Sequence, residues 1–221
     1  MKSLGKSMPA LLIISASIPL TCLLAQPAGT SKVLLAMGAN AKQIVQYTWK
    51  QRVTVVRKGK PAQPLIDQVR FDSGGQMQRT TISAPEQPGG IRGKVAAGVK
   101  ANVKEIMELA GSYNKPQQIV AAVKKAQVYQ NPRGGAMRLQ ANDLLKPGDA
   151  ITMLISPTTN LATHIDIKTT YDGGPMTIAQ DYSPLSGGPN VMKTMKVSVP
   201  GKDLVVNVES YDYARQTARG R

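Results

Sequence analysis

The stretch from Asn160 to Gly174, "NLATHIDIKTTYDGG", carries the clearest structural signal in this chain of 221 residues. Its two sets of alternate positions differ in character: the first is Leu161, Thr163, Ile165, Ile167, Thr169 and Tyr171, and the second is Ala162, His164, Asp166 and Lys168. A period of two predicts a strand with one face packed and the other in water, as in antiparallel sheets. The closing Asp-Gly-Gly is typical of a turn.

The same alternation recurs on both sides of a helical segment. Residues 46–61, "QYTWKQRVTVVRKGKP", predict a first strand with Tyr47, Trp49, Val53 and Val55 on its inner side and Lys50, Arg52 and Thr54 on its outer side. Residues 65–72 and 76–83 predict two more strands, and about six or seven others follow from residue 127 onward. The connections are short, which favours antiparallel neighbours.

Three segments have helical spacing instead. They cover residues 31–46, residues 91–113 and a shorter stretch that begins at Pro116, where proline suits the first turn. The expected inward residues are Leu34, Leu35, Met37, Ala41, Ile44 and Val45 in the first helix, Val95, Val99, Val103, Ile106 and Ala110 in the second, and Ile119, Val120 and Val123 in the third.

This order of elements predicts an α+β fold. A long run of antiparallel strands twists and curls, and three helices are too few to cover a large flat sheet. We therefore expect a strongly curved antiparallel β-sheet, a half-barrel, with an N-terminal helix and two inserted helices on its concave side.

The N-terminus has the pattern of a secretory signal peptide. Lys2 and Lys6 precede an uncharged apolar stretch from Leu11 to Leu24, and Ala25 suits a cleavage site. The alternative is a membrane anchor, but the stretch contains Pro19 and is shorter than a span of roughly 20 residues. We expect a signal peptide over residues 1–25, a half-barrel domain over residues 26–221, and a periplasmic or outer-envelope location.

Cys22 is the only cysteine and leaves with that peptide. A lipid anchor on Cys22 is the alternative, although Thr21 and Pro19 fit a lipidation signal poorly. After cleavage we expect neither a disulfide nor a thiol nucleophile.

The chain is strongly basic, with a formal net charge of +15. Such a protein is attracted to anionic partners, and for an exported one we expect an anionic envelope surface. Nucleic-acid binding is disfavoured, because Trp49 and Tyr47 alternate with Lys50 and Arg52 and so cannot share one stacking platform.

No catalytic set is evident in the sequence. The single histidine, His164, stands on the polar side of its strand, and the spacing identifies neither a nucleophile nor further metal ligands for it. We therefore expect no catalytic residue, no metal site and no cofactor.

Methionine suggests where a ligand could bind. Several methionines fall on the apolar side of predicted strands, where thioethers either fill a core that is poor in aromatic residues or line an adaptable apolar cavity. The candidate groove residues are Trp49, Val53, Phe71, Met77, Val99, Val103, Met153, Met176 and Met195.

The order of elements resembles the bacterial lipoprotein carrier and receptor superfamily, the LolA/LolB-like fold. The phrases "QYTWKQRVTV", "DQVRFDSGGQMQRT" and "LKPGDAITM" are also similar to uncharacterised secreted bacterial proteins. The resemblance implies a curved sheet whose helices close over an apolar cavity. It places no functional residue of those carriers on this chain.

These observations lead to one main hypothesis and two alternatives. The main hypothesis is an exported, non-enzymatic binding protein whose apolar groove accepts a lipid, an acyl chain or a lipoprotein. The first alternative is a structural or adhesive envelope protein with a filled core and a basic surface. The second is a hydrolase. The sequence does not define the oligomeric state.

Overall fold

The computed structural model describes residues 28–72, 77–84, 90–130 and 135–216, and at residue 28 and within 90–97 it describes only the backbone. The expected signal peptide, Cys22 and the side chain of Val95 lie outside the described residues. The three helices are α1 (Ala28–Ile44), α2 (Gly90–Tyr113) and α3 (Pro116–Lys125), and a short 3₁₀ helix, η1, covers Pro200–Lys202. The first strands are β1 (Tyr47–Arg57), β2 (Lys60–Pro61), β3 (Leu65–Phe71) and β4 (Met77–Ser83). The later strands are β5 (Gln127–Tyr129), β6 (Met137–Asn142), β7 (Ala150–Ile155), β8 (Ala162–Tyr171), β9 (Gly174–Pro184), β10 (Asn190–Val199) and β11 (Leu204–Arg215).

The strands form one antiparallel sheet in the order β4-β3-β1-β11-β10-β9-β8-β7-β6-β5, with β2 paired to β1. The chain therefore enters the sheet at β1, the third strand from one edge, runs out to the β4 edge, and crosses by α2 and α3 to the β5 edge. From there it returns strand by strand until β11 lies beside β1. The register places Val53 opposite Val208 on one side and opposite Leu65 on the other.

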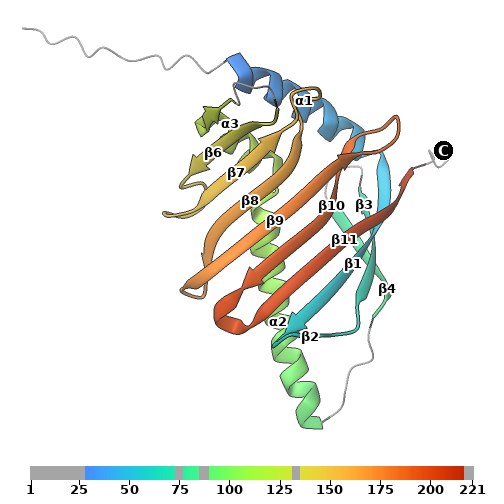
Figure 1. Cartoon of the computed structure of the whole chain (residues 1–221). Coiled ribbons are helices and arrows are strands. Elements are labelled where there is room, and N and C mark those ends of the chain that lie inside the picture. Colours follow the sequence, from blue (N-terminus) through green and yellow to red (C-terminus); the bar gives the residue numbers. More distant parts are fainter. Residues whose placement is uncertain (1–27, 73–76, 85–89, 131–134, 217–221) are drawn as a thin grey trace, which may run out of the picture.

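One face of the sheet, which we call the inner face, packs against the helices. Figure 1 shows α2 behind the sheet and α1 across its upper end. A single apolar core joins residues of all three helices, such as Val33, Ile106 and Val123, to inner-face residues such as Ile151 and Ile155. The predicted α+β half-barrel is confirmed.

The predicted buried sides of α1 and α3 are partly wrong. Val33 is the fully buried apolar residue among the described side chains of α1, and Leu34 and Met37 lie half-buried beside it. Leu35 is instead 75% exposed, and Val45 and Ala41 are also exposed. In α3, Ala122 is buried and Val120 is exposed. Both helices contact the rest of the protein along a narrow line, so apolar residues one position away from that line face water.

Two irregularities change the alternation that the sequence shows. In β8 the pairing with β7 shifts between Ile155 and Leu154, so Ala162 is buried and Thr163 is exposed, contrary to the prediction for that strand. In β10 the pairing with β9 shifts between Met192 and Thr194, which explains why Lys193 interrupts an apolar side. An extra residue in one strand displaces the alternation in this way.

The predicted turn at the end of the opening stretch is confirmed. Tyr171 pairs with Gly174, and the two residues between them, Asp172 and Gly173, have φ values of 51° and 73°. Two positive φ values are what a two-residue hairpin turn with the correct twist requires, and Asp-Gly tolerates them.

A buried polar cluster fastens the end of α2 to the sheet. The Tyr113 hydroxyl donates to Asp149 Oδ2 at 2.6 Å and lies 2.8 Å from Thr169 Oγ1, and all three side chains are buried. Burial alone would raise the pKa of Asp149, but hydrogen bonds from Tyr113, Thr169 and the amides of Lys146 and Leu145 hold it below its ordinary value. Asp149 is thus a buried carboxylate whose acceptor oxygens depend on these donors.

Replacing Tyr113 by Phe should lower the free energy of unfolding by about 1–3 kcal/mol, because a buried carboxylate loses a donor. Urea denaturation measures the change. The matched control is Tyr129→Phe, since the Tyr129 hydroxyl makes an exposed hydrogen bond to Gln127, and that variant should be nearly neutral. Equal effects of the two substitutions would contradict the anchoring role.

Candidate functional site

Four of the predicted groove residues belong to the packed core. Met153, Met176 and Met195 lie on β7, β9 and β10, and each is at most 5% exposed. Val53 of β1 joins the same core. The inner face is therefore filled at these positions by the protein's own side chains, which include adaptable thioethers.

Two other predicted residues form an aromatic cluster near the start of β1. The ring centroids of Trp49 and Tyr213 are 5.7 Å apart with an interplanar angle of 18°, and Phe71 lies 5.7 Å from Trp49 at 50°. Met77 pairs with Phe71, yet it is 47% exposed, because β4 is an edge strand whose side chains are exposed throughout. Met77 thus lies apart from the other groove residues.

The last two predicted residues lie on α2, and both are half-buried. Val103 packs against the apolar core. Val99, one turn earlier, lines a pocket between α2 and the β10–β11 connection. The structure thus divides the nine residues among the core, the aromatic cluster, the edge strand and this pocket.

We call this pocket the basic pocket, and its volume is about 310 Å³. Its lining residues are Arg57, Lys58, Val99, Asn102, Gly201, Lys202, Asp203 and Leu204. Three of them carry a positive charge and one a negative charge. The apolar lining, Val99 and Leu204, comes from α2 on one side and from the start of β11 on the other.

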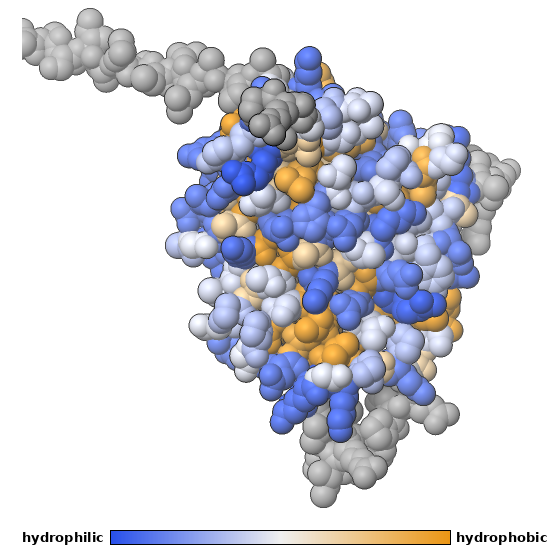
Figure 2. Space-filling view, viewed as in Figure 1, coloured by the Kyte–Doolittle hydropathy of each residue, from blue (hydrophilic) through white to orange (hydrophobic). Residues whose placement is uncertain are grey.

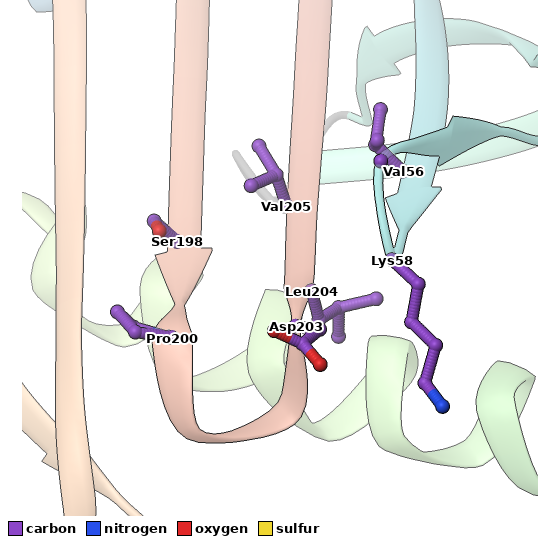
Figure 3. A pocket seen from close by; sticks show the side chains of 8 residues that line it. Val56, Lys58, Ser198, Pro200, Asp203, Leu204 and Val205 are labelled. Carbon is purple, nitrogen blue, oxygen red and sulfur yellow. The ribbon is translucent and has the colours of Figure 1, made fainter.

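A second pocket, of about 600 Å³, lies on the opposite side of the same turns. Val56, Ser198 and Val205 stand on the outer face of the sheet, turned away from α2, as Figure 3 shows. The two pockets share Lys58, Asp203 and Leu204. Figure 2 shows that mainly hydrophilic residues cover the outer face, with a hydrophobic patch in its lower half.

The sequence reasoning missed a polar row on the inner face. Asp67 pairs with Thr81 and with Gln51, and Gln51 pairs with Ser210, so these four side chains cross four neighbouring strands. Thr81 donates to Asp67 at 2.8 Å and Gln51 donates to Ser210 at 3.2 Å. The sequence feature that could have predicted this row is a polar residue at an inward position of a strand, such as Gln51 between Trp49 and Val53.

Two buried polar atoms beside this row lack hydrogen-bond partners. They are Nε1 of Trp49 and Oε1 of Gln51. Rotating the Gln51 amide by 180° would pair its oxygen with Ser210 but leave its nitrogen unpaired, so either orientation leaves one polar atom unpartnered. The inner face therefore combines apolar packing with unused hydrogen-bonding capacity.

The hydroxyl groups near this row remain protonated at neutral pH. Burial raises the pKa of Tyr213 to about 12, and a hydrogen bond with the Ser210 side chain acts in the opposite direction. Burial also raises the pKa of Tyr182, whose hydroxyl donates to Gln180 at 2.9 Å. These phenols can donate or accept hydrogen bonds, but they are unsuited to proton transfer near pH 7.

His164 lies between two carboxylates on the outer face. Its Nδ1 is 2.7 Å from Asp181 and its Nε2 is 3.0 Å from Asp166. Burial alone would lower the pKa of His164, but these two acids outweigh burial and raise it. The Thr194 hydroxyl donates to Asp181 and not to the imidazole, so the group lacks the nucleophile–base hydrogen bond of a catalytic triad.

The described parts of the chain offer neither a metal-binding cluster nor a membrane-spanning helix. Among those residues, no group of three or more His, Cys, Asp or Glu side chains could hold a metal ion. None of the described helices is both long enough and apolar enough to cross a membrane.

Comparison with known proteins yields structural likenesses only. No protein-family model and no curated protein matches the chain. A DUF1329 family protein from Desulfovibrio piger aligns with a TM-score of 0.46 at 9% identity, covering 87% of this chain and 94% of the other. An outer membrane lipoprotein-sorting protein domain from Vibrio parahaemolyticus aligns at 0.43 and 8%, covering 86% and 95%. A LolA superfamily protein from Nitrosomonas europaea aligns at 0.42 and 7%, covering 85% and 94%.

The environment of His164 predicts a pH-dependent stability. Because the folded-state pKa is raised, the charged imidazole stabilises the fold below its ordinary pKa of about 6.5, and this contribution is lost as pH rises through the raised value. The free energy of unfolding should therefore fall by about 0.5–1 kcal/mol between pH 5.5 and pH 8.5. Because His164 is the only histidine, no other imidazole contributes to this change.

Urea denaturation at these two pH values tests this prediction. The variant His164→Gln should abolish most of the difference, and Asp181→Asn should reduce it. If His164→Gln retained the wild-type pH dependence, another group would have to be responsible.

Proposed function

We propose that this protein is an exported, non-enzymatic binding protein that accepts a lipid, an acyl chain or a lipidated partner between α2 and the inner face. One observation carries the proposal: the apolar lining of the basic pocket is continuous with the core. Leu204 lines the pocket and is a core residue, and Val103 packs against that core one helical turn from Val99. An apolar chain entering the pocket would therefore meet apolar side chains along its path.

The described hydrogen bonds that attach α2 to the sheet leave its N-terminal half, beside the basic pocket, free to move away from the sheet. In the part of α2 whose side chains are described, hydrogen bonds to the sheet come from Glu105, which accepts from Tyr171, and from Tyr113. Asn114, directly after the helix, accepts from Gln180. These bonds lie toward the C-terminal half of α2, so its first half can separate from the sheet without breaking them.

The side chains beneath α2 are suited to such a movement. Met153, Met176 and Met195 are unbranched and can change rotamer to accommodate a guest. Their near-complete burial also suits the competing proposal, a structural or adhesive envelope protein whose core is permanently filled. Ligand uptake distinguishes the two proposals.

Trp49 provides a direct test, because it is the only tryptophan and lies on the inner face. A fatty acid brominated near the end of its chain should quench Trp49 fluorescence in a saturable way, since bromine quenches only at short range. Iodide, a quencher confined to water, should have little effect on this buried ring. Absence of quenching by the brominated acid, together with absence of bound acid after gel filtration, would favour the filled-core alternative.

Narrowing the path should weaken uptake. Val103→Phe enlarges a half-buried side chain between the basic pocket and the core, and we expect roughly tenfold weaker binding of the brominated acid, equivalent to about 1.4 kcal/mol. The matched control is Val120→Phe on the exposed side of α3, which should bind like the wild type. If Val103→Phe and Val120→Phe bound the brominated acid equally well, the acid would not pass Val103 when it binds.

A further inference from the structure

We propose that the basic pocket binds the anionic headgroup, a carboxylate or a phosphate, of an amphiphile whose apolar chain points toward Trp49. This inference rests on the proposed function and adds the class of ligand and its orientation. It starts from the distribution of charge around the pocket, where Arg57, Lys58 and Lys202 face one acid, Asp203.

Two adjoining turns hold these cations in place. Arg57 ends β1, and Lys58 begins the turn that leads to β2. The amide of Lys58 donates to the carbonyl oxygen of Asp203 at 2.9 Å, which ties this turn to the turn between η1 and β11. Lys58 and Asp203 both have positive φ values, 49° and 48°, a conformation that non-glycine residues seldom adopt. The tie between the turns thus fixes the backbone from which the cations extend.

Arg57 and Lys58 carry the charge that is available to a ligand. Lys202 already pairs with Asp172 at 2.8 Å. Among the described residues, no carboxylate lies within ion-pairing distance of Arg57 or Lys58. Two cations of the outer face differ in this respect, because Lys50 pairs with Asp212 and Arg52 pairs with Glu209.

The pocket places these charges next to an apolar entrance. Val99 and Leu204 line the same pocket as Arg57 and Lys58, and Leu204 continues into the core. A ligand that satisfies both features has a negative group joined to an apolar chain. A free anion would leave the apolar lining unused, and a neutral lipid would leave the two cations unpaired.

The strand direction sets the orientation of the bound chain. Arg57 lies at the end of β1 near the pocket, and Trp49 lies eight residues earlier, roughly 26 Å away at the usual rise of a strand. With the headgroup at Arg57 and Lys58, the end of the chain points toward Trp49. A bromine near the chain end should therefore quench Trp49 more strongly than a bromine near the carboxylate.

The experiment compares brominated fatty acids with fatty alcohols of the same chain and bromine position, using Trp49 quenching at low salt. We expect the wild type to bind the acid about tenfold more tightly than the alcohol, because two weakly screened ion pairs are added. The double variant Arg57→Gln/Lys58→Gln should lose this preference and keep its affinity for the alcohol. The control Lys168→Gln/Lys196→Gln removes the same charge from exposed positions on other strands and should keep the preference.

A single-chain alkyl phosphate and inorganic phosphate distinguish the source of the anion. The alkyl phosphate should compete with the brominated acid, and inorganic phosphate at the same concentration should not. Equal competition by both would overturn the amphiphile assignment in favour of a free-anion site. Equal binding of acid and alcohol, unchanged in the double variant, would overturn the headgroup assignment and leave the proposed function standing. Absence of quenching by both compounds, together with absence of bound acid after gel filtration, would instead reject the proposed function itself.

Discussion

The pairing of β1 with β11 is the interaction on which the rest of the structure depends. It joins the strands formed before α2 to those formed after α3, and without it the sheet would be two smaller pieces. The Trp49–Tyr213 stack, the Gln51–Ser210 hydrogen bond and the tie between Lys58 and Asp203 all cross this pair. The aromatic cluster and the basic pocket are therefore products of the same long-range pairing, at opposite ends of β1.

The inner face has two regions that differ in their chemistry. Beneath α2 it is an aliphatic and thioether core, in which residues such as Met153 and Ile151 are fully buried. Toward β1, β3 and β4 it carries the polar row that includes Gln51 and Asp67. A uniformly filled core has no need of buried polar atoms without partners, because each costs about 1–3 kcal/mol. The two such atoms of the described residues, Trp49 Nε1 and Gln51 Oε1, both lie in this polar region and not beneath α2.

Alternation along the sequence was sufficient to predict most strands, the inner side of β1 and the half-barrel. It could not reveal that β1 lies beside β11, because a period of two indicates which face a residue occupies but not which strand is its neighbour. The shifts at Thr163 and Lys193 were hidden for a related reason, since an extra residue becomes visible only against its partner strand. For α1, the sequence offers more apolar residues than the contact line uses, so Leu35 was indistinguishable from Val33.

The sequence predicted some residues of the candidate site but not how they are arranged in space. Val99 was predicted as a groove residue and lines the basic pocket. Arg57, Lys58 and Lys202 were not predicted as site residues, because the chain is rich in cations throughout. These three cations differ from the other lysines and arginines only in their place on the turns that bring together the ends of β1 and β10.

The central position of β11 also shapes how the protein is made. Until β11 has been synthesised, β1 and β10 each expose an unpaired edge. β11 follows β10 directly in the chain, but it is far from β1 in sequence. Such non-local pairing slows folding and leaves open strands that can join other chains. We therefore expect a chain that lacks β11 to aggregate instead of forming a smaller stable sheet.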